Sequence, residues 1–482
     1  MMLWLARASR AGWVALAPAA ADDDPDAFPA AAGAGAGTPA PAVPDWLAEL
    51  AELPCEQPAS SRAAPDMSPA HVSAVVRSGP REARARTVGF MPVGRVPPGA
   101  RFRRSGHGPV TDGRPPGGAQ AATWPGLAII GGMIEPKGLK SAPEASGTHS
   151  YPKIELHVHL EGTVRAGTLL QIARRNGIAL PADSEAGLAG LYEFRDFGHF
   201  VEIWLLTTGA LRTEQDFRQV VVDYAGEAAA HGAVYLEGIF SPAEPVGRGV
   251  AWEEVFTGYC DGARQAREQH GVEVRLTPDI PRGFPLEAAE LTARYAVKYR
   301  DRGVVGLGLG GQEAEFPPEP YAPAFALARD GGIGSVPHAG EAAGVSSIRG
   351  ALTALRADRI RHGIRAVDDP GLVRELADRG TVLDVCPVSN LRTGVVASLA
   401  AHPLPDLVAA GVRCSVSTDD PAMFGTDLGI EYQAASRLGV LPGVIYQAGL
   451  QGALCDEETR ATLRRAGDAC DWAAATAGDP AT

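Results

Sequence analysis

The sequence predicts an α/β fold, a TIM-type (β/α)8 barrel with a helical insert after its first strand and a long N-terminal extension before it. Three observations lead to this fold. From residue 151 onward, short runs of β-branched residues alternate with longer amphipathic runs, the strand-like runs number eight, and polar clusters follow them at their C-terminal ends. A doubly wound open sheet is the alternative, but it would not explain why the polar clusters all lie at strand C-terminal ends.

Eight short runs are the strand candidates. They cover residues 154–159, 233–240, 272–277, 304–309, 333–338, 359–362, 381–386 and 413–418. Helical patterns separate them and include residues 213–231, 252–270, 286–302, 346–357, 369–379 and 405–410. Several of these helices are expected to end at a glycine in the left-handed conformation, namely Gly232, Gly271, Gly303, Gly380 and Gly411.

Residues 1–150 form an extension ahead of the predicted barrel domain, which covers residues 151–482. Up to about residue 132 the extension is dominated by Ala, Pro, Gly and Arg. Such a composition buries too little apolar surface to offset the entropy of ordering, so we expect disorder. Because Met133 opens a stretch of ordinary composition, a further hypothesis is that translation starts there. The intact mass of the protein from its native host would test this, and a chain beginning at Met1 would contradict it.

Composition and charge limit the possible partners. The formal net charge of -13 argues against a nucleic-acid backbone as the main partner and favours a neutral or cationic small molecule. Hydrophobic residues make up 45% of the chain, which is enough for a large core, yet no apolar run is long enough to span a membrane. The six cysteines show no C-x-x-C spacing, which favours a reduced, cytoplasmic setting.

An aromatic-rich helical segment, residues 188–211, follows the first predicted strand. Its large side chains include Tyr192, Phe194 and Trp204. Two interpretations remain open, a lid over the pocket or an ordinary core helix.

A candidate metal site begins with His157 and His159 at the end of the first strand. Side chains alternate along a strand, so the two imidazoles point to the same face and reach one ion. His338 ends the fifth strand, and Asp419 and Asp420 follow the eighth. Taken singly, each has a plainer interpretation as a core histidine or a helix N-cap, but their coincidence at strand ends favours a shared site.

Nitrogen and carboxylate ligands without thiolates suit a catalytic zinc ion that keeps an open position for water. Coordination lowers the pKa of that water to near 7, which makes hydroxide available at neutral pH. Binuclear relatives of such barrels bridge two metals through a modified lysine at the end of the fourth strand. Residues 304–311 contain no lysine, so we expect one zinc ion per subunit.

The chain from about residue 151 to 470 resembles the adenosine deaminase family of the amidohydrolase superfamily. The motifs that carry this resemblance are His157-Val158-His159-Leu160-Glu161-Gly162, Gly311-Gln312-Glu313, His338-Ala339-Gly340-Glu341, Arg361-His362-Gly363, Cys386-Pro387-Val388-Ser389-Asn390 and Ser417-Thr418-Asp419-Asp420-Pro421. The resemblance implies hydrolytic removal of a purine 6-amino group as ammonia, with a (β/α)8 barrel as the scaffold. It also implies that zinc is held by His157, His159, His338 and Asp419.

The resemblance further implies roles for the remaining site residues. Glu341 would give a proton to purine N1 while hydroxide attacks C6, and His362 would orient the water and help to deprotonate it. Asp420 would accept from or share a proton with N7, and the backbone of Gly311 would meet N3. An acid at N1 and a carboxyl group at N7 stabilise the charge that attack at C6 places on the ring nitrogens.

Two departures from the family pattern bear on the substrate. Glu161, expected at the sugar end, replaces the usual Asp, and Gly308 and Gly310 make the end of the fourth strand more permissive. Both suggest a substrate other than simple adenosine, and the Glu variant occurs in adenine deaminases and in 6-aminodeoxyfutalosine deaminases of menaquinone synthesis. We favour an adenine nucleoside with a modified 5′ side, leaning to 6-aminodeoxyfutalosine. Adenosine deaminase proper, adenine deaminase and an inactive zinc-binding barrel that serves as a binding module remain the alternatives.

Overall fold

The computed structural model describes residues 151–194 and 197–477 of the chain. The predicted N-terminal extension lies outside these residues, and so does the hypothesis of a start at Met133. Among the helices in the described ranges, none combines the length and the apolar character that a membrane span requires.

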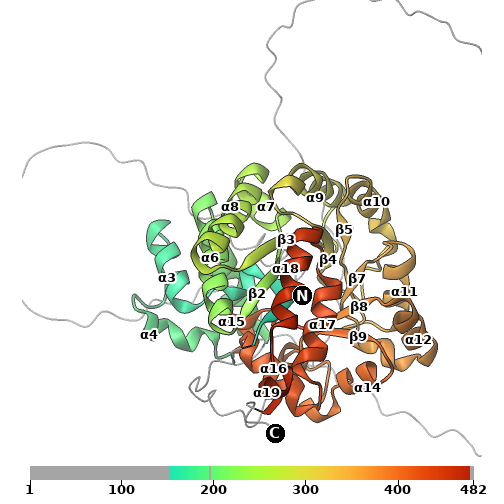
Figure 1. The fold of residues 1–482 in the computed structure, drawn as a ribbon. Coiled ribbons are helices and arrows are strands. Elements are labelled where there is room, and N and C mark those ends of the chain that lie inside the picture. Colours follow the sequence, from blue (N-terminus) through green and yellow to red (C-terminus); the bar gives the residue numbers. More distant parts are fainter. Residues whose placement is uncertain (1–150, 195–196, 478–482) are drawn as a thin grey trace, which may run out of the picture. The chain divides into compact units, whose positions relative to one another are not determined.

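Short parallel strands form the centre of the described part of the chain (Figure 1). Two of the predicted strands, 233–240 and 359–362, have the observed bounds, and the others differ by a few residues. The strands are β1 (Lys153–His159), β2 (Ala233–Phe240), β3 (Glu273–Pro281), β4 (Gly306–Gly310), β5 (Gly334–Ser335), β6 (His338–Ala339), β7 (Arg359–His362), β8 (Val382–Val385) and β9 (Arg413–Val416).

The predicted fifth strand, residues 333–338, is divided into β5 and β6. Pro337 lies at the division and has no N–H group to donate to a neighbouring strand. Hydrogen bonding nevertheless continues through this segment, because the Val336 N–H donates to the Leu307 carbonyl at 2.9 Å. β5 pairs with β4 and β6 pairs with β7, so the two halves act together as one barrel strand.

The strands close into a barrel, as predicted. The pairing order runs from β1 to β5 and from β6 to β9. The remaining seam joins β1 to the end of β9, where the His159 N–H donates to the Asp419 carbonyl at 2.7 Å and the Asp419 N–H donates to the His157 carbonyl at 3.1 Å. This seam lies at the candidate metal site, so closing the barrel also fixes three of the residues expected there.

Helices surround the strands and join their ends (Figure 1). The predicted helix 286–302 is shorter, because the chain tightens to a 3₁₀ turn at Arg300–Arg302. All five glycines predicted at helix C-termini have positive φ angles, between 67° and 100°. The helices that follow the strands include α6 (Glu214–Ala230), α8 (Trp252–His270), α9 (Leu286–Lys298), α10 (Ala322–Asp330), α11 (Val345–Thr353), α12 (Pro370–Arg379) and α14 (Leu404–Ala409).

The insert after β1 is helical, as the aromatic pattern predicts. It contains α3 (Ala166–Arg175), α4 (Glu185–Leu188), the 3₁₀ helix η2 (Ala189–Tyr192) and α5 (Phe197–Ala210). Trp204 is buried and packs with Met423 and Phe424 of α15 (Pro421–Phe424), the short helix that begins directly after Asp420. The insert therefore packs beside the candidate site, while its role as a lid remains a prediction.

Four C-terminal helices complete the domain: α16 (Leu428–Arg437), α17 (Pro442–Gly452), α18 (Glu457–Asp468) and α19 (Trp472–Ala477). The chain after α17 crosses the N-terminal end of the barrel. There the carbonyl of Gly452 accepts a hydrogen bond from Arg359 of β7 at 2.7 Å. The N–H of Leu454 donates to Glu237 of β2 at 2.6 Å. This end of the barrel is thereby covered, which leaves the C-terminal ends of the strands for chemistry.

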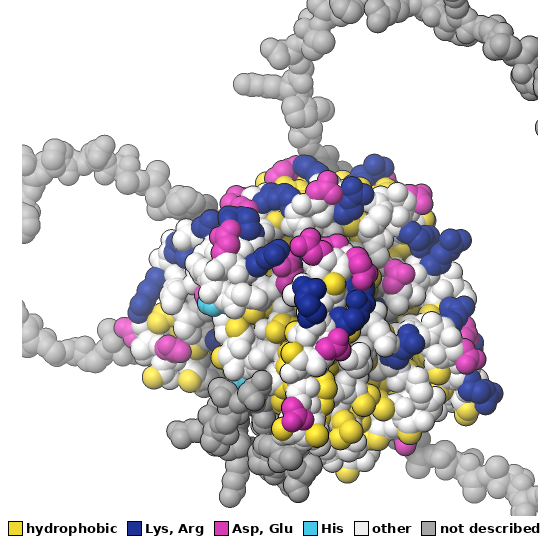
Figure 2. Space-filling model, viewed as in Figure 1, with side chains coloured by type: hydrophobic (Ala, Val, Ile, Leu, Met, Phe, Trp, Pro, Cys, Tyr) yellow, Lys and Arg dark blue, Asp and Glu magenta, His cyan; other side chains and the backbone are white. Residues whose placement is uncertain are grey.

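Charged side chains of both signs are mixed over the face shown in Figure 2. On the described surface in this view, basic side chains do not form a continuous stripe of the kind that tracks a nucleic-acid backbone.

Candidate active site

The candidate site begins with a β-bulge in β1. Between Glu155 and Val158 the strand contains one residue more than the segment of β2 with which it pairs. The hydroxyl oxygen of Ser417, which follows β9, accepts hydrogen bonds from the N–H groups of Leu156 at 3.1 Å and His157 at 3.2 Å. Ser417 therefore stabilises the local backbone geometry that directs His157 and His159 toward one point.

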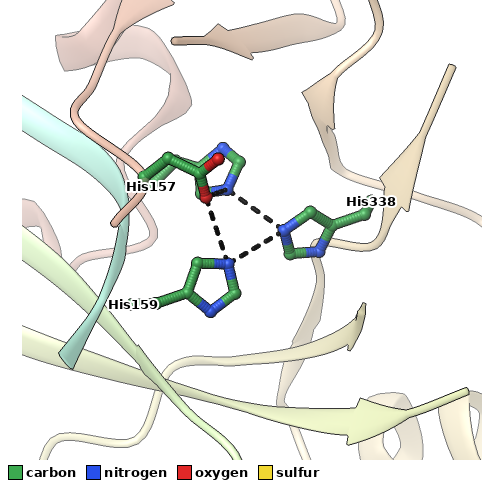
Figure 3. A group of neighbouring side chains, drawn as sticks. His157, His159 and His338 are labelled. Atoms are coloured by element: carbon green, nitrogen blue, oxygen red, sulfur yellow. Dashed lines mark hydrogen bonds and ion pairs between the residues drawn. The ribbon is translucent and has the colours of Figure 1, made fainter. Parts of the chain in front are cut away.

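Three imidazoles and one carboxylate converge at that point (Figure 3). The Nε2 atom of His338 lies 3.1 Å from Nε2 of His157 and 3.2 Å from Nε2 of His159. Oδ1 of Asp419 lies 3.2 Å from Nε2 of His157 and 3.3 Å from Nε2 of His159. Ligand atoms around a tetrahedral zinc ion with bonds of about 2.0–2.1 Å are about 3.3–3.4 Å apart, so these spacings fit one ion.

The hydrogen bonds of the His157 and His338 rings leave the Nε2 atoms of these two residues suited to bind a cation. Nδ1 of His157 donates to the Asp384 carbonyl at 3.3 Å, and Nδ1 of His338 donates to the Leu309 carbonyl at 3.1 Å. In each neutral ring, Nε2 then carries a lone pair. Burial lowers the pKa of His157 to about 3 and the pKa of His338 well below its ordinary value. Two lone pairs 3.1 Å apart repel each other unless a cation lies between them, so the donor set fits a metal ion.

Asp419 is held in place by both its side chain and its backbone. The hydroxyl of Ser389 donates to Oδ2 of Asp419 at 2.6 Å, which leaves Oδ1 facing the histidines. The φ angle of Asp419 is 65°, in the left-handed region that non-glycine residues rarely adopt. Such conformations persist where the surroundings impose them, and they concentrate at functional sites.

Replacing Ser389 by Ala is expected to weaken metal binding by about 10-fold to 100-fold, the usual effect of removing a group that orients a ligand. The variant leaves Oδ2 of Asp419 without its donor and frees the carboxylate to rotate. Competition with a chelator measures the affinity. Ser398→Ala, at an exposed serine, is the matched control, and equal affinities in both variants would contradict the assigned role of Ser389.

Glu341 and His362 lie next to the four candidate ligands. Nε2 of His362 is 3.5 Å from Oε2 of Glu341 and 3.9 Å from Oδ2 of Asp419. Burial raises the pKa of the Glu341 carboxyl, and the negative charges of Asp419 and Glu313 raise it further. A carboxyl group with a raised pKa is suited to donate a proton near neutral pH.

Glu313 holds the loop that carries Glu341. Its carboxylate accepts hydrogen bonds from the N–H groups of four consecutive residues, Gly340 to Ala343. Burial raises the pKa of Glu313, but hydrogen bonds from the backbone of Ala343 and Gly340 and from Ser347, together with the charge of Arg282, outweigh burial and keep the pKa below its ordinary value. Glu313 belongs to a motif singled out in the sequence, yet the sequence alone assigned it no role.

Asp420 and Glu161 place two more carboxyl groups at the site. Oε1 of Glu161 accepts from the Ser241 N–H at 2.9 Å and from the Tyr259 hydroxyl at 3.1 Å. Among the described residues, Oε2 of Glu161 and Oδ1 of Asp420 have no hydrogen-bond partner, although both are buried. Burial raises the pKa of Asp420 well above its ordinary value. Buried acceptors without partners are the groups that a polar ligand would satisfy.

Gly162 makes room for Asp420. A Cβ atom at position 162 would overlap the Asp420 carboxyl group. Replacing Gly162 by Ala is therefore expected to displace Asp420 and to lower kcat/KM by about 100-fold, the scale of a misplacement of about 1 Å. Metal content should stay unchanged, as elemental analysis would show. Gly190→Ala, which adds a methyl group in open space, is the control, and full activity of Gly162→Ala would rule out this packing argument.

Gly308 and Gly310 have a packing role that the sequence did not reveal. A Cβ atom at either position would clash with the carboxylate of Asp279, which follows Pro278 in β3. Asp279 in turn lies 3.4 Å from Nδ1 of His338 and pairs with Arg361. The two glycines thus admit a group that supports His338, which gives them a role apart from the permissive strand end expected from the sequence. Gly311, at the end of β4, has a φ angle of 105°.

Among the described residues, the possible ligand groups all share members of this cluster, so the structure contains one candidate metal centre. A closed parallel barrel with such a candidate centre at the C-terminal ends of its strands is the arrangement of metal-dependent enzymes of the (β/α)8 class. Residues 152–466 match the family model for adenosine deaminase. The chain belongs to the adenosine deaminase family of the amidohydrolase superfamily.

Similar proteins include several deaminases. The chain is 55% identical to an aminodeoxyfutalosine deaminase from Acidothermus cellulolyticus over 333 residues. The matched residues cover 68% of this chain and 94% of that protein. It is 39% identical over 315 residues to an adenine deaminase from Rhizobium leguminosarum bv. trifolii, covering 64% of this chain and 97% of that protein. The crystal structure of an adenine deaminase from Arthrobacter aurescens matches with a TM-score of 0.62 and 30% identity over 66% of this chain and 98% of that one. An amidohydrolase from Burkholderia ambifaria with bound zinc matches with a TM-score of 0.60 and 26% identity, over 68% of this chain and 92% of that one.

Proposed function

We propose that this protein hydrolyses the 6-amino group of an adenine nucleoside and releases ammonia, and that its nucleoside is 6-aminodeoxyfutalosine. One observation supports this type of reaction. Three imidazoles and Asp419 converge beside the Glu341 carboxyl group, whose pKa is raised. A purely structural metal site has no use for Glu341, His362 and Asp420, whereas hydrolytic deamination uses all three.

The metal is proposed to be zinc, one ion per subunit, held by His157, His159, His338 and Asp419. The donor set of three nitrogens and one carboxylate oxygen suits zinc, and a structurally similar amidohydrolase contains it. When bound, zinc supplies a Lewis acid that brings the pKa of water toward 7.

The protein's own residues then hold the purine and move the protons. Glu341 donates a proton to N1 as water adds to C6, and ammonia leaves from the same carbon. Asp420 shares a proton with N7, and the backbone of Gly311 meets N3. His362 orients the attacking oxygen. These contacts grow stronger as negative charge develops on the ring nitrogens, so they favour the transition state over the bound substrate.

The choice of nucleoside rests on the degree of similarity and on Glu161. The chain is more similar to an aminodeoxyfutalosine deaminase, at 55% identity, than to an adenine deaminase, at 39%. Oε2 of Glu161 is a buried acceptor without a partner among the described residues, and it would accept a hydrogen bond from the sugar side of a nucleoside. Adenine deaminase activity is the second candidate, because several similar proteins carry that name.

A comparison of rates tests the proposal. The zinc-loaded protein would be given 6-aminodeoxyfutalosine, adenosine, 5′-methylthioadenosine and adenine, and loss of the 6-amino chromophore would be followed by absorbance. The highest kcat/KM is expected for 6-aminodeoxyfutalosine. A higher value for adenine would favour the second candidate, and no turnover of any 6-aminopurine would favour an inactive binding module.

A further inference from the structure

A chain of buried hydrogen bonds leads from the start of α14 to His362. It runs through His402, which follows the 3₁₀ turn Leu399–Ala401, and through Asn390, which lies in α13 (Pro387–Arg392). The exposed fractions of His362, Asn390 and His402 are 1%, 0% and 3%. Asn390 belongs to a motif that the sequence singled out and to which the proposed chemistry assigns no role.

The direction of each hydrogen bond in this series follows from the first one, between Leu404 and His402. The backbone N–H of Leu404 can only donate, and it lies 3.1 Å from Nδ1 of His402. Nδ1 of His402 is therefore the acceptor, and the proton of this neutral ring is on Nε2. Burial lowers the pKa of His402 to about 4, which agrees with a neutral ring at pH 7.

The next two hydrogen bonds determine which ring nitrogen of His362 carries the proton. Nε2 of His402 donates to Oδ1 of Asn390 at 3.2 Å. The amide nitrogen of Asn390 is thereby turned toward Nδ1 of His362, also at 3.2 Å, and it can only donate. Nδ1 of His362 must accept, so the proton of neutral His362 is on Nε2.

The opposite orientation of the Asn390 amide does not satisfy these contacts. With its amide nitrogen facing His402, Nε2 of His402 would have to accept and Nδ1 would carry the proton. That proton would then face the N–H of Leu404, and two donors would oppose each other in a buried site.

The consequence appears at the reaction centre. Nε2 of His362 points toward Oε2 of Glu341 and Oδ2 of Asp419, at 3.5 and 3.9 Å. His157 and His338 donate through Nδ1 and therefore offer a lone pair at Nε2. His362 has the reverse arrangement and offers an N–H group instead. It is thus unsuited to ligate the metal and suited to donate a hydrogen bond to the attacking oxygen. The same arrangement leaves Nε2 without a lone pair to take a proton from the water, so it replaces that part of the role that the family resemblance implies for His362.

We infer that Asn390 and His402 are positioning residues, which act through His362 by fixing its proton on Nε2 and aiming that N–H group at the attacking oxygen. The expected effect on the reaction rate rests on the proposed function. The position of the proton on His362 does not, because it follows from the hydrogen bonds alone. Asn390 and His402 themselves are not expected to touch the substrate.

The position of the proton can be measured without turnover. Nitrogen NMR of protein labelled with ¹⁵N-histidine distinguishes protonated from unprotonated ring nitrogens, and His362→Gln identifies the signals of His362 by their loss. In the wild-type protein, Nε2 of His362 is expected to carry the proton and Nδ1 to lack it. A protonated Nδ1 and an unprotonated Nε2 would overturn the inference.

Asn390→Asp tests the same point with almost no change in volume. A carboxylate at this position still accepts from His402 but cannot donate, so the proton of His362 should move to Nδ1. A catalytic histidine in the wrong tautomer loses up to about 10⁴-fold in kcat, and a loss of about 10²-fold or more is expected here. KM should stay within about threefold and metal content should be unchanged. Unchanged kcat together with an unchanged tautomer would refute the role of Asn390.

Variants of His402 provide a second test if the buried carboxylate prevents folding. His402→Phe removes both hydrogen bonds and is expected to lower kcat in the same way. His402→Gln keeps one acceptor and one donor, so it should recover activity to within about tenfold of the wild-type protein. Equal losses in the two variants would indicate a packing role only and would overturn the inference for His402.

Thr393→Val is the matched control, because the Thr393 hydroxyl donates only to the backbone carbonyls of Ser389 and Asn390 and leaves the Asn390 side chain, which contacts His362, in place. It should keep both kcat and the tautomer of His362. The two proposals fail separately. A wild-type protein without deaminase activity would refute the proposed function and leave the NMR result standing, whereas an active protein that is indifferent to Asn390→Asp and His402→Phe would refute only this inference.

Discussion

Replacing Glu341 by Gln is expected to lower kcat by about 100-fold or more while the protein keeps its metal, because a positioned general acid contributes about 10²-fold to 10⁴-fold. Gln preserves the size of the side chain and its contacts in the loop held by Glu313, but it has no acidic proton for N1. Steady-state rates on the preferred 6-aminopurine, together with metal analysis of the same samples, measure the effect.

The control for this substitution is Glu315→Gln, which removes the same charge from an exposed position two residues beyond Glu313. Its kcat should match that of the wild-type protein. If Glu341→Gln kept the wild-type rate, Glu341 would have no part in the proton transfer.

The pH dependence should identify the same group. Burial and neighbouring negative charge raise the pKa of Glu341, so its carboxyl group keeps the proton to higher pH than an exposed glutamate. A general acid works only below its pKa, so kcat should fall as pH rises through that value. The residual activity of Glu341→Gln should not show this fall of kcat at high pH. If the variant still showed the fall, another group would be responsible for it.

Replacing Asp419 by Ala is expected to remove both metal and activity. Oδ1 of Asp419 lies 3.2 and 3.3 Å from two of the histidine nitrogens, so the variant loses one of four candidate ligands and the only negative one. Removal of a group that merely orients a ligand weakens binding by about 10-fold to 100-fold, and loss of the ligand itself should exceed this. Elemental analysis after dialysis measures the metal that remains.

The adjacent carboxylate provides the matched comparison for this experiment. Asp420→Asn should keep the metal and lose activity, because Asp420 is assigned to the purine and not to the ion. Full occupancy in Asp419→Ala, or loss of metal in Asp420→Asn, would mean that the proposed ligand set is wrong.

Much of the fold could be predicted from the sequence because its signals are local. The alternation of side chains along β1 placed His157 and His159 on one side, and glycines marked five helix ends that the structure confirms. The division of the fifth strand was missed, although Pro337 is a visible signal for it. The C-terminal helices α16 to α19 were not predicted, and the hydrogen bonds that hold the chain across the barrel end come from β2 and β7.

The candidate site also has residues that could be named from the sequence and others that only the structure revealed. The four candidate ligands were named from the sequence, because three histidines and an aspartate follow or end predicted strands, and the structure brings these four side chains together. The groups that orient them were not. Asp279 belongs to none of the motifs found in the sequence, and the glycines whose small size admits it were interpreted as making the end of the fourth strand more permissive.

The sequence by itself therefore determined which strands form, which side chains end them and which family the chain resembles. Only the tertiary structure decided the bulge in β1, the left-handed conformations of His362 and Asp419, and the backbone partners of the His157, His338 and His402 rings. These features depend on partners that are distant in the chain, such as Ser417, which accepts from Leu156 across 261 positions. A hydrogen bond assigns a proton only when both of its atoms have been brought together, and folding alone brings them together.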